Sequence, residues 1–176
     1  PRMTALPRKK LPIGIQTFAK IREGGAHYYY VDKTPLALQL IDEGTHYFLS
    51  RPRRFGKSLF LDTLKELFEG NASLFKGLYA EQHWDWSVKH PVLRFSFGGG
   101  VVQDAQDLQG RIDSHLRRFE EAHGLHAVDA SLPERFRTLI LQLAAKTGQR
   151  VVVLVDEYDK PILDRIEDRE KALAIR

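Results

Sequence analysis

The sequence contains no cysteine, which excludes disulfide bridges and thiolate metal sites. It has no apolar run near the roughly 20 residues that a membrane helix needs. The basic start PRMTALPRKK leads into no apolar segment of the kind found in signal peptides. These absences indicate a cytoplasmic protein with no membrane contact. The net charge of +4 is modest, and because the basic residues are scattered among acidic ones, direct DNA binding is a weak hypothesis.

Length and composition indicate a soluble globular protein. The 176 residues are 43% hydrophobic and 28% charged, enough for one domain with a real core. Residues 1–12 are rich in proline and basic residues and are expected to form a loose arm before a domain at 13–176. The sequence ends in a helix-like pattern without a stop signal. We therefore expect the chain to be part of a longer protein.

The first half of the sequence predicts a helix, a strand and a second helix. Thr34 is expected to cap a helix that has proline in its first turn and ends at Gly44. The segment HYFLS at 46–50 is predicted to be a short apolar strand. After it, an amphipathic helix ends at Gly70. Its predicted apolar face consists of Phe60, Leu61, Leu64, Leu67 and Phe68.

The second half predicts two strands separated by two helices. HPVLRFSFGGG alternates as a strand does and runs into a glycine turn. The first helix carries Leu108, Ile112, Leu116 and Phe119 on one face and ends at Gly124. The second begins with the capping box Ser131-x-x-Glu134 and ends at Gly148. The apolar strand Val151–Val155 is expected to be covered on both faces, which is typical of the parallel sheet of an α/β protein.

The stretch FLSRPRRFGKS carries Gly-Lys-Ser between the predicted strand and an amphipathic helix. In a phosphate-binding loop, successive backbone N–H groups and the N-terminus of the next helix surround the phosphates of a nucleotide. The lysine adds positive charge near the β- and γ-phosphates, and the serine hydroxyl ligates Mg²⁺. Lys57 and Ser58 occupy these positions, whereas Arg51 replaces the first glycine of the general pattern.

A second motif follows the buried strand. An aspartate at the end of such a strand can hold Mg²⁺, and the next glutamate can polarise an attacking water. Asp156 and Glu157 have these positions. The two motifs together are far more specific than either alone.

Three segments carry a resemblance to a known family: YYYVDKT, FLSRPRRFGKS and VVVLVDEYDKPIL. They resemble the bacterial AAA-ATPase-like domain usually found N-terminal to a PD-(D/E)xK nuclease-like domain, and the resemblance runs from about Leu11 to the end. In that family the arginine at the position of Arg51 is usual, so this loop is a family variant. The resemblance implies a P-loop NTPase-like fold, with a mostly parallel sheet flanked by helices.

The same resemblance implies ATP and Mg²⁺ as cofactors. The expected nucleotide-binding residues are Arg54, Phe55, Gly56, Lys57, Ser58 and Leu59. The expected metal ligands are Ser58 and Asp156, and the expected catalytic residue is Glu157. The predicted function is Mg²⁺-dependent ATP binding and hydrolysis within a larger bacterial protein. The alternative is a nucleotide-responsive interaction module with little turnover, which positions a nuclease-like or other partner domain.

Several of these residues also have plainer interpretations. Lys57 and Ser58 could mark an ordinary helix N-terminus, and Glu157 could be a surface carboxylate at the end of a strand. Arg53 and Arg54 could add positive potential at the phosphates or pair with surface acids.

The sheet is expected to be incomplete beside Val151–Val155. In the resembling fold a sensor strand lies next to the Asp-Glu strand and follows it in sequence, but this chain ends before it. A strand that is apolar on both faces needs cover on both faces and neighbours on both edges. Either the gap stays open, or 46–50 pairs there, or another chain's strand fills it. We expect self-association and weak or no ATP turnover from residues 1–176 alone.

Overall fold

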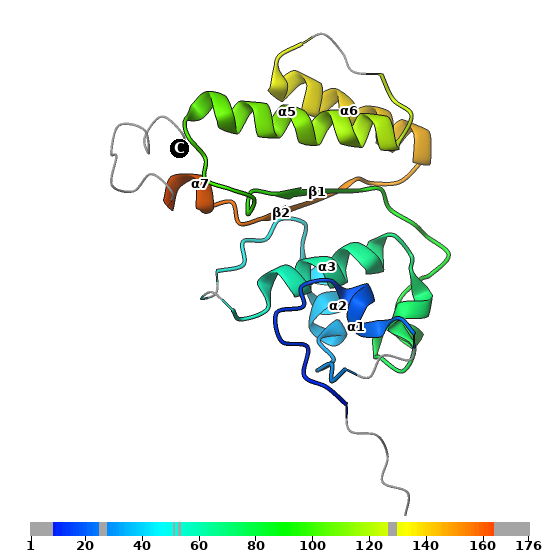
Figure 1. Ribbon diagram of the computed structural model, residues 1–176. Helices are drawn as coiled ribbons and strands as arrows, with labels where there is room; N and C mark the ends of the chain where they lie inside the picture. Colours follow the sequence, from blue (N-terminus) through cyan, green and yellow to red (C-terminus); the bar gives the residue numbers. More distant parts are fainter. Residues whose placement is uncertain (1–8, 25–27, 51, 53, 127–129, 164–176) are drawn as a thin grey trace, which may run out of the picture. The chain divides into compact units, whose positions relative to one another are not determined.

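The computed structural model describes residues 9–24, 28–50, 52, 54–126 and 130–163, which form parts of two compact units. The N-terminal unit comprises residues 1–89, and the C-terminal unit comprises residues 90–176 (Figure 1). Each unit is described by itself. Residues 1–8 of the predicted arm, together with Arg51 and Arg53 of the phosphate loop, lie outside the described residues.

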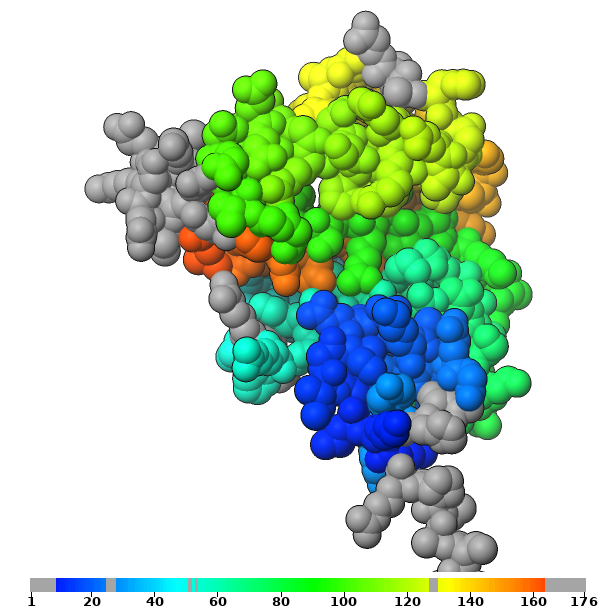
Figure 2. Space-filling view, in the orientation of Figure 1, coloured from blue at the N-terminus to red at the C-terminus, as the bar shows by residue number. Residues whose placement is uncertain are grey.

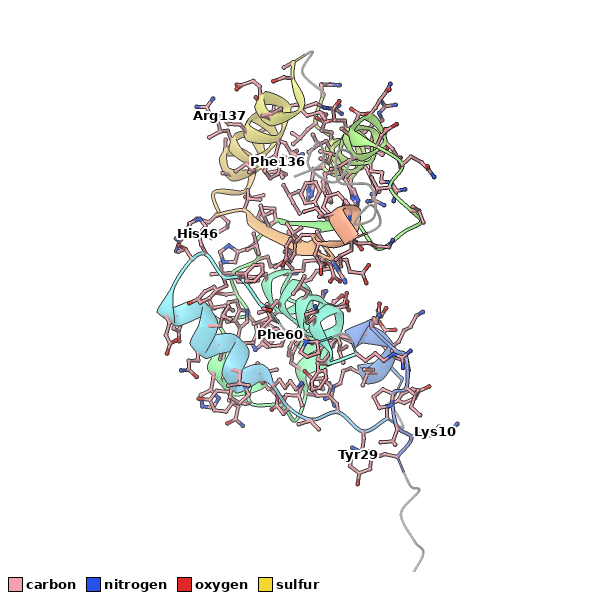
Figure 3. All side chains as sticks on the ribbon, turned by 90° about the vertical axis from the view of Figure 1, so that its left-hand side faces the viewer. Lys10, Tyr29, His46, Phe60, Phe136 and Arg137 are labelled. Carbon is pink, nitrogen blue, oxygen red and sulfur yellow. The ribbon has the colours of Figure 1, made fainter. Side chains whose placement is uncertain are left out.

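The described part of the N-terminal unit is helical. Its elements are α1 (Phe18–Arg22), α2 (Thr34–Glu43), α3 (Lys57–Phe68), the 3-10 helix η1 (Ala72–Phe75) and α4 (Ala80–His83). An isolated bridge joins Lys10 to Tyr28, and the N–H of Tyr29 donates to the carbonyl of Lys10 at 2.8 Å (Figure 3). The predicted loose arm is therefore tied by backbone pairing at its C-terminal end.

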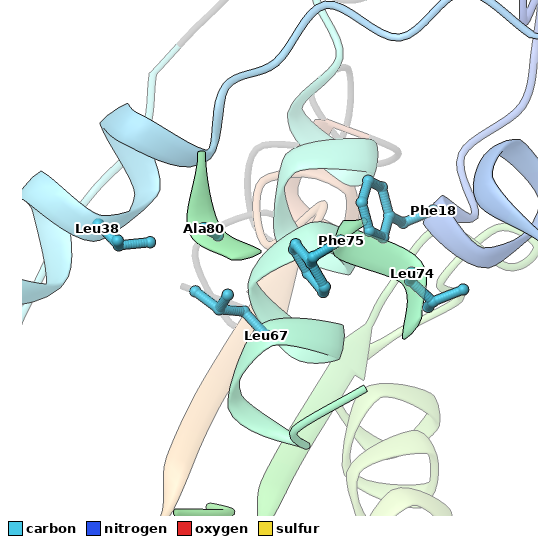
Figure 4. Close-up of a cluster of buried hydrophobic side chains, with 6 residues drawn as sticks. All are labelled: Phe18, Leu38, Leu67, Leu74, Phe75 and Ala80. Carbon is cyan, nitrogen blue, oxygen red and sulfur yellow. The ribbon is translucent and has the colours of Figure 1, made fainter. Parts of the chain in front are cut away.

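The core of this unit forms around α3. Its buried side chains come from five elements and are Phe18, Leu38, Leu67, Leu74, Phe75 and Ala80 (Figure 4). The rings of Phe18 and Phe75 lie 4.9 Å apart between centroids. Trp84 and Trp86 pack against this cluster. The segment after α4 is thus a packed connection.

The helix α3 has its predicted extent, but its buried face is more polar than predicted. The buried residues of α3 are Asp62, Thr63, Leu64, Glu66 and Leu67. The Asp62 carboxylate accepts the N–H of Phe18 at 2.6 Å. Since the first N–H groups of a helix have no partner within it, Asp62 satisfies the start of α1. Hydrophobic periodicity alone does not reveal such a role.

The predicted strand at 46–50 is wrong, because the structure has no strand there. Tyr47, Phe48 and Leu49 are 50%, 68% and 39% exposed. A strand forms where its backbone pairs with that of a neighbour, and the described part of the N-terminal unit contains no strand to serve as one. The apolar composition of 46–50 therefore predicted a strand where the structure has none.

The predicted N-cap at Thr34 is also wrong, because Thr34 is the first residue of α2 and Lys33 occupies the cap. The Asp32 carboxylate accepts the N–H of Thr34 at 2.9 Å and its hydroxyl at 2.7 Å. Its other oxygen accepts the N–H of Tyr79 at 2.7 Å, and the Thr34 hydroxyl accepts the N–H of Ala80 at 3.0 Å. The Asp-Lys-Thr sequence thus joins the starts of α2 and α4.

The C-terminal unit is an α/β arrangement. It contains β1 (Val92–Ser96), α5 (Ala105–Ala122), α6 (Leu132–Thr147), β2 (Val152–Asp156) and α7 (Lys160–Leu163). The strands β1 and β2 are parallel, with Val92 opposite Val152 and Ser96 opposite Asp156. The two predicted strands, the two long helices and the parallel arrangement are confirmed, and the described sheet has these two strands.

The helices α5 and α6 lie side by side over one face of this sheet (Figure 1). Their shared core with β1 is formed by Leu93, Phe95, Leu116, Leu139 and Leu143. Register places Val153 and Val155 on the same face as Leu93 and Phe95, yet they are 39% and 43% exposed. The expected full cover of β2 is therefore not found within the described residues, because the core under α5 and α6 is built mainly on β1.

A buried ion cluster joins α6 to α5. The Arg135 guanidinium donates to both carboxylate oxygens of Glu120 and to Asp113. Arg135 and Glu120 are buried, and their hydrogen bond is the main cause that raises the pKa of Arg135 above its usual range. The predicted capping box is wrong, because Ser131 makes no side-chain cap bond and Glu134 pairs with Arg137 instead.

Replacing Arg135 with alanine should destabilise the C-terminal unit by about 3 kcal/mol, because Glu120 would remain buried without its partner. Arg137→Ala is the matched control on the same helix. Its side chain is 69% exposed and lies on the outer side of α6, whereas Phe136 packs inward (Figure 3). Urea denaturation followed by circular dichroism measures both. Equal losses of stability in the two variants would contradict the assigned role of the buried cluster.

Candidate functional site

The turn before α3 has an unusual backbone conformation. Gly56 caps the helix with φ 77° in the left-handed region, and its carbonyl accepts the N–H of Phe60 at 3.0 Å. Only glycine adopts this region without strain. Arg54 also has a positive φ, 67°, which costs a residue with a side chain about 1–3 kcal/mol. Such strain is often found at ligand-binding turns.

The predicted nucleotide-binding residues form this turn and the beginning of the helix. Arg54, Phe55 and Gly56 are exposed, and 57–59 form the first turn of α3 and are partly exposed. Gly56, the N-cap residue, has no side chain that could accept a hydrogen bond from the first N–H groups of the helix. The first N–H groups of a twelve-residue helix carry partial positive charge, so this turn is suited to an anion.

The predicted acidic pair lies at the carboxyl end of the two parallel strands. Asp156 is the last residue of β2 and is buried, and its carbonyl accepts the N–H of Phe97 at 3.2 Å. Glu157 follows with an exposed side chain and φ 53°. In open α/β sheets, ligands bind at this end of the strands. Asp156 and Glu157 therefore lie at the end of the sheet where ligands usually bind.

The glycine turn after β1 makes room for Glu157. A Cβ built on Gly98 would overlap the Glu157 carboxylate, whereas a Cβ on Gly99 would meet nothing within 4 Å. The absence of a side chain at Gly98 thus lets the Glu157 carboxylate lie against the turn after β1. The sequence indicated only a turn here, because nothing local to Gly98 shows which side chain lies against it.

Sequence reasoning missed Arg94 as a site residue. Its Nη2 lies 3.4 Å from an Asp156 carboxylate oxygen, and both side chains are largely buried. The only sign in the sequence was a charged residue in the middle of a predicted strand that is otherwise largely apolar. The pair compensates the charge of Asp156, so a metal ion at this carboxylate would have to compete with Arg94.

The structure brings Asp156 and Glu157 together in the C-terminal unit and Gly56, Lys57 and Ser58 together in the N-terminal unit. A joint site of the two groups stays a prediction. Within the described ranges, no three His, Asp or Glu side chains gather in a way that could hold a metal ion. In the same ranges, no helix combines the length and apolar character needed to span a membrane.

Comparison with known proteins identifies a family and a relative of the chain. A family model described as "Predicted AAA-ATPase" matches residues 12–176. The chain is 65% identical over 171 residues to the "Uncharacterized protein in vnfD 5'region" of Azotobacter chroococcum mcd 1. The aligned region covers 97% of this chain and 33% of that protein. The chain thus spans about a third of that relative's length, and no solved structure matches it. Because the family model covers nearly all of the sequence, the chain belongs to the AAA-ATPase-like family.

Proposed function

We propose that the chain is an Mg²⁺-dependent ATP-binding domain with a P-loop NTPase-like fold, and that the whole protein hydrolyses ATP in the cytoplasm. The observation that carries this proposal is the Gly56-Lys57-Ser58 sequence at the start of a twelve-residue helix, with Gly56 left-handed. Membership of the AAA-ATPase-like family supports it.

Each predicted residue has a role in this proposal. The loop 54–59 surrounds the phosphates with backbone N–H groups, and Lys57 places its charge beside the β- and γ-phosphates. Ser58 and Asp156 offer the hydroxyl and carboxylate oxygens that suit Mg²⁺. Bound Mg²⁺ would neutralise charge on the phosphates, and Glu157 would orient the attacking water. The whole protein is further proposed to contact a nuclease-like domain or nucleic acid and to self-associate.

The Arg94–Asp156 ion pair favours a second candidate function. A carboxylate already compensated by an arginine binds a metal ion less readily than a free one. In this alternative the domain binds nucleotide, turns over little, and positions a partner domain. Measurements of binding and of hydrolysis distinguish the two candidates.

Lys57→Ala should weaken ATP·Mg²⁺ binding to the whole protein by about 10-fold or more, because a charge-assisted hydrogen bond to phosphate is lost. Isothermal titration calorimetry measures the affinity. Lys76→Ala is the control, since Lys76 is an exposed lysine of the same unit outside the loop. Unchanged affinity in Lys57→Ala would contradict the proposed phosphate site.

Glu157→Gln should slow single-turnover phosphate release from the whole protein by about 100-fold while nucleotide binding is kept, because general-base assistance is removed. The glutamine is nearly the same size, so the fold should not change. Rapid quench with labelled ATP measures the release. Equal release from the wild type and the variant would favour the interaction module.

Gly98→Ala should also slow hydrolysis, because the added methyl group displaces the Glu157 carboxylate. The flexible end of a glutamate can move, so the melting temperature should change little. Gly99→Ala is the matched control in the same turn, where the methyl group has open space. If both variants hydrolyse ATP like the wild type, the contact between Gly98 and Glu157 has no role in the reaction.

A further inference from the structure

A hollow of about 790 Å³ lies within the C-terminal unit between β1 and α5. Figure 2 shows α5 across the front of this unit, above residues of the sheet. The ionisable side chains that line the hollow are Arg94, Arg111, Arg118, His115 and Asp107. Asp107 is the only carboxylate among the lining residues, all of which belong to the described part of the chain.

Two of the three arginines are paired with acids. Arg111 lies 3.2 Å from Asp107 and also donates to the carbonyls of Gly99 and Val101, so it holds the glycine turn after β1. Arg94 is paired with Asp156. These two cations are therefore compensated by neighbouring carboxylates.

Arg118 has no carboxylate within ion-pair distance among the described residues. Its guanidinium contacts Nδ1 of His115, and Nε2 of the same ring lies 3.2 Å from the carbonyl of Ser96. A guanidinium can only donate and a carbonyl can only accept, so His115 is neutral, with its hydrogen on Nε2. Burial lowers the pKa of His115, and the charge of Arg118 lowers it further. At the hollow, a neutral histidine thus contacts an arginine that has no acidic partner among the described residues.

The outer edge of β1 adds polar backbone groups to the same wall. Pro91 and Phe97 direct their backbone groups to β2, so Ser96, at the alternate position, directs its own away from β2. The carbonyl of Ser96 accepts the hydrogen bond from Nε2 of His115. Ser96 is exposed and lines the hollow.

We propose that this hollow binds a phosphate group carried by a nucleotide or by a nucleic-acid backbone, at a site separate from the Gly56-Lys57-Ser58 loop. The planar guanidinium of Arg118 offers two parallel N–H donors, the geometry that matches phosphate oxygens. The hollow is larger than one phosphate, so it has room for a phosphate that is part of a larger molecule.

The test uses the chain with Lys57→Ala in every sample, so that binding at the phosphate loop is weakened equally in all of them. Inorganic pyrophosphate is titrated by calorimetry, and a fluorescent single-stranded oligonucleotide without a 5′-phosphate is followed by anisotropy. Adding Arg118→Gln should weaken binding of at least one probe by about 10-fold. For the oligonucleotide it should also reduce the dependence on salt by about one counterion.

Arg117→Gln is the matched control, since Arg117 is the preceding residue of α5 but pairs with Asp113 and does not line the hollow. It should leave binding unchanged. Ser114→Glu places a carboxylate on the wall and should abolish binding. Pyrophosphate binding alone would identify a small phosphate ligand, and oligonucleotide binding would identify a polynucleotide. If neither probe binds, or if Arg118→Gln and Arg117→Gln behave alike, the proposal is wrong.

Discussion

The parallel register of β1 and β2 determines where the charged groups of the C-terminal unit lie. Because Ser96 stands opposite Asp156, the chain leaves both strands at the same level, and the turn after β1 meets the residue after β2. Arg94, two residues earlier on β1, comes within reach of the Asp156 carboxylate. A slip of one residue would move Asp156 to the helix-covered face. The hydrophobic packing of Leu93 therefore also fixes the position of the acid pair.

The buried ion cluster between α5 and α6 has a comparable effect on the hollow. Arg135 contacts Glu120 and Asp113 with three of its donors, which restricts how α5 can rotate against α6. Burying such charges costs desolvation energy, so the cluster specifies geometry more than it adds stability. Rotation of α5 would move Arg118 and the other lining residues of that helix together. The arrangement at the hollow thus depends on contacts made on another side of the same helix.

The sequence predicted elements better than it predicted contacts. Strong periodicity located α3, α5 and α6, and the apolar strand before Asp156 was predicted within a parallel sheet, although its pairing with β1 was not. The segment 46–50 was misassigned because strand formation depends on a partner that local composition does not reveal. Asp62 was missed because its function is to satisfy a helix start 44 residues away. The contacts of Arg94 and Gly98 with the acid pair join residues about 60 positions apart and follow only from strand register.

Arg94 connects the two charged regions of the C-terminal unit, because it lines the hollow and also pairs with Asp156. A cation at Asp156 would repel its guanidinium, and an anion in the hollow would attract it. The cation and the anion would both draw the Arg94 guanidinium away from Asp156, and each would therefore weaken the ion pair between these two residues. Because that pair is largely removed from water, it is little screened, and a change at either end is felt at the other. The electrostatics of the acid pair and of the hollow are therefore coupled through one side chain.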